Sequence, residues 1–390
     1  MITKRILLVV VILTIIVCSN SSFSTVNGEG FEADGYLSQV EIAAPVRAKV
    51  LEVLDHQTEE IEYSGGVFVT ETKILLIEVT QGPYKNQIVE ALYQINTFSS
   101  VYNIDIKKGD GVLVYIESDS QGQIVDTYIV ELLRENYLFY LFFAFIILLI
   151  VIGRTKGLKA IISLGLTCFA VIKILLPAIL NGNDPITITI LTCIALIAVN
   201  LIIISGINKK TFAAIIGTSG GLMTAGVITL VVGTAARLTG MGNEEAHMLI
   251  YVSQDITINF QGLLFAAILI GALGAVMDIG ISVASSMYEI ELTKPDISKK
   301  NLIRSGLNVG KDVMATMSNT LILAYAGGSI HLMLLLMIQG IPFMEIVNSD
   351  YMASEVVRAL AGSIGLIVTI PVTALAMAVL SKNKNTGNAI

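Results

Sequence analysis

The sequence predicts a polytopic α-helical membrane protein with a small, strand-rich domain near its N-terminus. Apolar residues make up 54% of the chain and the mean hydropathy is +0.78, which is above the range usual for soluble proteins. Several apolar blocks reach the length of about 20 residues that a helix needs to cross a bilayer. Residues 25–136, in contrast, carry short β-branched segments separated by turn residues.

The N-terminal segment has the pattern of an export signal. Lys4 and Arg5 precede an apolar run over residues 6–18, which serines follow. Such a run fits a cleaved signal peptide or a short signal anchor better than a full span. We therefore divide the chain into the signal segment (1–24), an extracytoplasmic β-rich domain (25–136), a transmembrane helical domain (137–382) and a cytoplasmic tail (383–390).

The β-rich domain is expected to form a small all-β fold. Its candidate strands are residues 66–70, 74–80, 88–95, 112–117 and 124–130, with turn signals such as Gly82-Pro83 between them. This spacing predicts a small antiparallel barrel or sandwich of five to seven strands, with an OB-like barrel as the first choice. Residues 25–136 hold nineteen acidic and seven basic residues, which excludes a nucleic-acid-binding surface there.

Seven spans are expected after this domain, and the basic residues orient them. The spans are residues 137–152, 160–180, 186–205, 212–235, 259–281, 313–338 and 360–380, with a break in the sixth at Gly327-Gly328. Twelve basic residues fall in alternate loops, against two, Arg237 and Arg358, in the short loops of the other side. Since basic loops stay in the cytoplasm, the β-rich domain is predicted outside and the C-terminus inside, in the plasma membrane.

Small residues recur at the spacing that lets membrane helices approach closely. They are Gly217 and Gly221 in the fourth span and Gly262, Gly271 and Gly274 in the fifth. Lipid offers no hydrophobic drive for helix association, so such residues are typical of contact faces. We interpret them as packing positions.

Motifs for a nucleotide, a metal or a cofactor are weak. The segment SGLNVGKD (305–312) lacks the glycine spacing, the hydroxyl residue and the preceding strand of a phosphate loop. Glu244, Glu245, His247 and Asp255 could together hold a divalent ion, but a solvated acidic loop is the preferred interpretation. No catalytic motif appears, and no cofactor is expected.

Polar residues near the inner ends of the fifth and sixth spans form the candidate site. Asp278 and Ser282 share one helical face, and Asn308, Asp312 and Asn319 share a face of the next segment. Placing an ionisable group within a span costs free energy unless the group has a polar partner or contact with water. We expect a site for an ion, a proton or a small substrate here. The alternative is that Asp278 reaches water or pairs with Lys311.

Two other features lie on or beside the spans. Asn200 in the third span is expected to form a hydrogen bond between helices. Residues 296–307 mix apolar and basic side chains, which predicts a helix lying on the inner membrane surface.

Most of the chain, from the β-rich domain through the spans, resembles a known family, and the likeness is densest over residues 271–328. The segments GAVMDIGIS (274–282), SGLNVGKD (305–312) and MSNTLILAY (317–325) are similar to those of the YibE/F family of bacterial multi-spanning membrane proteins. The family's Met-Asp pair and Asn-Thr-Leu triplet map to Met277-Asp278 and 319–321. The resemblance implies architecture and a bacterial membrane, and adds little about substrate.

Three functions are compatible with these patterns. The first is a transporter or permease component for a small solute or ion, embedded in the lipid bilayer. The second is an envelope sensor or assembly protein whose outer domain binds a protein partner. The third is an intramembrane enzyme that uses Asp278 and Asp312 as an aspartyl pair. A polar cavity that reaches Asp278 from one face favours the first, a sealed helix bundle favours the second, and two carboxyl groups within hydrogen-bond reach favour the third.

The orientation can be tested with cysteines introduced at Ser120 and Lys300. An impermeant thiol reagent applied to intact cells should label the first and not the second, because basic loops resist export. Labelling at position 300 without labelling at position 120 would overturn the topology.

Overall fold

The structure is a computed structural model that describes residues 45–63, 66–97, 105–119, 122–242, 244–252 and 258–381. It divides into two compact units, one within Ser22–Leu148 and one that includes Leu149–Ile390, and each is described by itself. The expected signal segment (1–24), the tail (383–390) and Asp255 lie outside the described residues.

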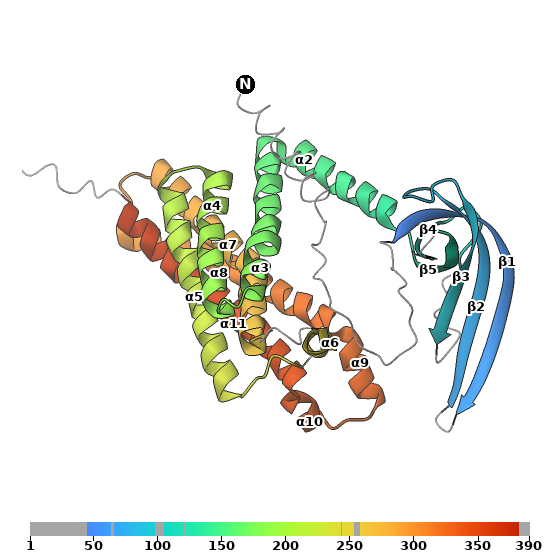
Figure 1. Cartoon of the computed structure of the whole chain (residues 1–390). Coiled ribbons are helices and arrows are strands. Elements are labelled where there is room, and N and C mark those ends of the chain that lie inside the picture. Colours follow the sequence, from blue (N-terminus) through green and yellow to red (C-terminus); the bar gives the residue numbers. More distant parts are fainter. Residues whose placement is uncertain are drawn as a thin grey trace, which may run out of the picture. The chain divides into compact units, whose positions relative to one another are not determined.

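The first unit contains a small β-barrel (Figure 1). It consists of β1 (Val46–Tyr63), β2 (Gly66–Val79), β3 (Ile88–Thr97), β4 (Gly111–Ser118) and β5 (Ile124–Leu132), closed in the order β1-β2-β3-β5-β4. β3 and β5 pair in parallel and the other neighbours are antiparallel. The expected small barrel is confirmed, and five strands with this closure fit an OB-like architecture.

Alternating side chains build the barrel core. Along β4, Val112, Val114 and Ile116 are buried while their neighbours are partly exposed, as the two-residue period of a strand requires. They pack with Leu75 and Ile77 of β2 in one cluster. This apolar interior accounts for the stability of the barrel in water.

The long β1–β2 hairpin differs from the expected strands. β2 joins the predicted segments 66–70 and 74–80, and β1 was not predicted as a strand. The two pair from Ala48 with Val79 to Tyr63 with Gly66, with register shifts between Val50 and Glu52 and between Val53 and Asp55. Residues 55–63 are mostly charged or polar, so their composition does not predict a strand. Pairing with β2 stabilises the strand instead.

The barrel should fold without the helices. We expect a secreted fragment of residues 25–135 to give a strand-dominated circular dichroism spectrum and a cooperative melt. Leu75 is 0% exposed, so Leu75→Ala should lower the free energy of unfolding by about 2–5 kcal/mol. The control Ile88→Ala, at a side chain that is 58% exposed, should change it by less than about 1 kcal/mol. A fragment that stays unfolded would contradict this independence.

Helices make up the rest of the described chain. They are α2 (Glu135–Ala170), η2 (Val171–Leu175), α3 (Leu176–Leu180), α4 (Pro185–Ser205), α5 (Lys209–Ala235), α6 (Glu244–Val252), α7 (Phe260–Thr293), α8 (Lys299–Gly328), α9 (Ile330–Ile338), α10 (Phe343–Asn348) and α11 (Asp350–Leu380). Among the described residues, five helical segments are long and apolar enough to cross a membrane, or six if the bent pair α8 and α9 forms one span.

The first two expected spans fall in one helical stretch, Glu135–Leu180. Its backbone leaves the helical conformation at Arg154, with φ 47° and ψ −124°. A side chain at Gly157 would collide with the backbone carbonyl of Leu149, so the chain turns tightly at this point. Arg154, Lys156 and Lys159, which mark the expected loop, lie in or directly after this turn.

Three further boundaries differ from the expectation. α7 continues to Thr293, twelve residues beyond the expected end, and α11 begins at Asp350, ten residues before the expected start. Residues 299–307, expected to belong to a separate surface helix, form the first part of α8, with Leu302 fully buried. The expected break is present: α8 ends at Gly328 and α9 leaves at an angle of 56°.

Helices α5, α7 and α11 pack against one another, while α4 packs against α5 and α7, and α8 packs against α7 and α11. Side chains at Gly217 and Gly221 of α5 would collide with Thr373 and Thr369 of α11. The backbones can therefore approach closely only because these positions lack a side chain. Gly262 lies against Pro185, and Gly271 lies against the hydroxyl group of Tyr325, whereas a side chain at Gly274 would meet no atom within 4 Å.

Polar contacts fix the N-terminus and one face of α4. The Nδ2 of Asn200 donates to the Oγ1 of Thr167 in α2 at 2.9 Å, which confirms the expected bond between helices. At the N-terminus of α4, the side chain and backbone amide of Thr187 both donate to Asp184. These hydrogen bonds hold the pKa of the Asp184 carboxyl group below its ordinary value.

The glycine contacts predict a contrast between two equal substitutions. Gly221→Ala should lower the stability of the full-length protein by about 1–3 kcal/mol, because the new methyl group collides with α11. Gly274→Ala should be neutral or stabilising by up to about 1 kcal/mol, since alanine favours a helix. Thermal unfolding of both variants in the same detergent checks this. Equal melting temperatures would contradict the packing described.

Candidate functional site

The structure places the predicted polar residues on the outward faces of α7 and α8. Asp278, Asn308, Asp312 and Asn319 are exposed and Ser282 is half-buried. Among the described residues, no hydrogen bond or ion pair joins Asp278 to another side chain, and none joins Asp312 to one. The aspartyl pair that an enzyme would need is therefore absent from the described arrangement, and so is a pair between Asp278 and Lys311.

Two contacts set the relative level of these helices. Gly271 lies against Tyr325, and Gly306 lies against Met287, so α7 and α8 run antiparallel. Asp278 lies between these two contacts along α7, level with the turn of α8 that contains Thr316. The buried face of α8, with Leu302, Gly306, Gly310 and Leu321, points the other way.

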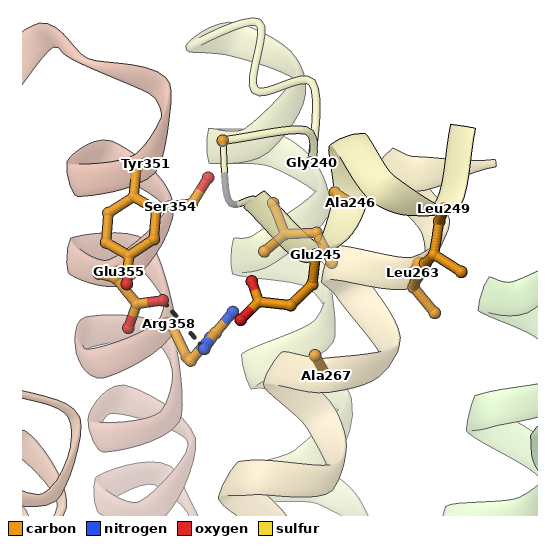
Figure 2. Close-up of a pocket in the computed structure, with 12 residues that line it drawn as sticks. Gly240, Glu245, Ala246, Leu249, Leu263, Ala267, Tyr351, Ser354, Glu355 and Arg358 are labelled. Atoms are coloured by element: carbon orange, nitrogen blue, oxygen red, sulfur yellow. Dashed lines mark ion pairs between the residues drawn. The ribbon is translucent and has the colours of Figure 1, made fainter. Parts of the chain in front are cut away.

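A cavity opens at the other end of α7, away from the polar residues of the predicted site. It has a volume of about 370 Å³ and lies among α6, α7, α11 and the loop that follows α5. Its polar lining includes Glu245, Tyr351, Ser354, Glu355 and Arg358 (Figure 2). Leu263, Leu264 and Ala267 of α7 form an apolar wall.

Glycines and one aspartate position the loop beside the cavity. The backbone amide and hydroxyl of Thr239 donate to the two carboxylate oxygens of Asp350, at 3.0 and 2.8 Å. Gly240 has φ +75° and lies against the carbonyl of Phe260, a conformation and a contact that disfavour any side chain. Gly242 packs on the backbone of Tyr351. The loop is therefore tied to the first turns of both α7 and α11.

An ion pair crosses one turn of α11 at the cavity. The Arg358 guanidinium lies 3.0 Å from the Glu355 carboxylate, and both side chains are mostly buried. The phenol of Tyr325 in α8 is close enough to interact electrostatically with both. Glu245 of α6 turns its carboxylate toward Arg358 across the cavity (Figure 2).

Several buried polar atoms around the cavity lack a partner. Among the described residues, no hydrogen-bond partner is present for the Oγ of Ser354, the Nε of Arg358 or the hydroxyl of Tyr325. A buried donor without an acceptor costs about 1–3 kcal/mol. Water or a ligand within the cavity would remove this cost for Ser354 and Arg358, which line it.

The spacing of polar residues in the sequence indicates this site, although hydropathy alone does not. The expected last span begins at residue 360, which leaves Glu355 and Arg358 in the loop before it. Tyr351, Ser354, Glu355 and Arg358 are spaced at three, four and seven residues, which is the pattern of one polar helical face. Glu245, assigned to an acidic loop, lies instead on helix α6. No group of three potential metal ligands is present among the described side chains.

Comparison with known proteins identifies the family. The family model described as YibE/F-like protein matches residues 141–383, which include the cavity and both polar faces. The chain belongs to the YibE/F-like family. No curated protein and no solved structure matches it. In this YibE/F-like protein the match begins after the barrel and covers the helices.

Proposed function

We propose that this YibE/F-like protein is a transporter or permease component that moves a small solute or ion across the bacterial plasma membrane. The cavity of about 370 Å³ with the Glu355–Arg358 pair carries the proposal. Ligand-binding cavities commonly have volumes of about 300–1,000 Å³. Ionisable groups inside a membrane helix bundle mark solute or ion pathways by default, because they are costly there.

One face of α7 connects the cavity to Asp278. Ala267 lines the cavity, and Gly271, Gly274, Asp278 and Ser282 follow at intervals of four, three, four and four residues, which keeps them on one face. The Cβ position of Gly274 meets no atom within 4 Å, so this face is open there. A solute leaving the cavity would travel about 16 Å along the helix to reach Asp278, at 1.5 Å per residue.

Tyr325 lies against this face between the cavity and Gly274. Its hydroxyl lies against Gly271, halfway between Ala267 and Gly274, and has no hydrogen-bond partner among the described residues. A movement of this side chain away from Gly271 would join the two polar regions. Tyr325 is thus in the position of a gate.

The proposed topology has the barrel outside and the C-terminus inside, as basic residues in alternate loops favour. The cavity then opens near the outer surface and Asp278 lies near the inner one. The barrel is a docking or filtering module on this view. A sensor that binds a protein partner is the second candidate, and the separation of the barrel as its own compact unit favours it.

Growth of a deletion strain tests the proposal. The strain should show altered resistance to one class of toxic ion or metabolite, together with a changed intracellular level of that solute, and the wild-type gene should restore both. An altered envelope stress response with unchanged solute levels would favour the sensor instead.

Asp278 should be required for transport. Asp278→Asn keeps the shape and the hydrogen-bonding capacity of the side chain and removes its charge, so we expect normal amounts of membrane-inserted protein and at least about a tenfold loss of the transport phenotype. Asn319→Ala should weaken the phenotype. The matched control is Asp296→Asn, in the exposed turn between α7 and α8, which should behave as wild type. Full activity of Asp278→Asn would remove Asp278 from the pathway.

A further inference from the structure

The charges around the cavity do not balance. Two carboxylates, Glu245 and Glu355, face one guanidinium, Arg358. Arg358 already pairs with Glu355 at 3.0 Å, while Glu245 has no ion-pair partner among the described residues. A ligand that enters this cavity is therefore expected to bring a positive charge to Glu245.

The unpaired hydrogen-bond donors of the cavity require a negatively charged group on the ligand. The Nε of Arg358 and the Oγ of Ser354 are buried without an acceptor, and Ser354 is only 6% exposed. Both residues lie on α11, four positions apart, so their side chains share one face. A carboxylate is the group that satisfies a guanidinium and a hydroxyl together.

The remaining wall is apolar. Leu263, Leu264 and Ala267 contribute it from α7, opposite the charged residues of α11. An inorganic cation would leave Ser354 and the Arg358 Nε without an acceptor, and a simple anion would meet two carboxylates. A small molecule with an ammonium group, a carboxylate and an aliphatic portion satisfies all three parts of the lining.

We infer that the cavity binds a free aliphatic amino acid, with its ammonium group at Glu245, its carboxylate at Arg358 and Ser354, and its side chain against α7. The inference rests on the proposed function in treating this molecule as the transported solute. Binding itself depends only on the cavity.

Binding to the purified full-length protein in lipid nanodiscs tests the inference. Titration calorimetry with L-leucine should show saturable binding. L-leucine methyl ester lacks the carboxylate and N-acetyl-L-leucine lacks the ammonium group, so each should bind at least about tenfold more weakly, since a site built for a polar group rejects an analogue without it. Equal binding of the ester, or no binding of L-leucine, would overturn the inference.

Variants assign the two ends of the ligand. Glu245→Gln should weaken L-leucine binding about tenfold, and Ser354→Ala should weaken it severalfold, through the loss of one charge and one hydrogen bond. The matched controls are Glu345→Gln on exposed α10 and Ser363→Ala, which is as buried as Ser354 and on the same helix. Both controls should bind as wild type. Unchanged binding in Glu245→Gln and Ser354→Ala, with melting temperatures like wild type, would remove the cavity as the site.

Flux measurements separate this inference from the proposed function. The same protein in liposomes should carry radiolabelled L-leucine. Binding without flux would overturn transport and leave the binding site intact. Flux of another solute without L-leucine binding would overturn the inference and leave transport intact.

Discussion

The helical unit depends on the close approach of α5 and α11. Gly217 and Gly221 lie directly against Thr373 and Thr369, and a side chain at Gly365 of α11 would meet the carbonyl of Gly221. In a bilayer, lipid chains are as apolar as leucine, so burial of apolar surface does not hold helices together and shape must do so. The glycines permit contact between backbones, and α7 packs against both helices. The positions of the cavity residues on α7 and α11 follow from this packing.

Polar groups in the bundle are found in three different situations. The Nδ2 of Asn200 donates to Thr167 between helices, which is a structural role, although the Oδ1 of Asn200 has no partner among the described residues. Around the cavity, Ser354 and the Nε of Arg358 are buried without partners, and water or a ligand there would satisfy them. Other hydroxyl groups of the bundle, such as those of Thr218 and Thr373, also lack a partner among the described residues. Asp278 represents a third situation, an exposed charge on a membrane helix that a lipid environment would not satisfy.

The barrel is stabilised by a different interaction from the helical unit. Its core consists of alternating Val, Ile and Leu side chains, and water supplies the drive for their burial. The chain thus combines one unit stabilised by the hydrophobic effect with one stabilised by close packing. The family match, to residues 141–383, lies in the helices.

The sequence by itself determined the class of the protein. Long apolar blocks and β-branched segments at regular intervals were sufficient to predict a membrane helix bundle and a small barrel, since bilayer thickness and strand periodicity act locally. The positions of α4 and α5 and the break at Gly328 followed in the same way. Asp350, Glu355 and Arg358 could not be placed, because hydropathy treats charged residues as loop, and only packing against α7 and the loop after α5 turns them into the first turns of a helix. The tertiary structure therefore decided the site: a cavity is made by residues far apart in the chain, and no local pattern encodes which of them meet.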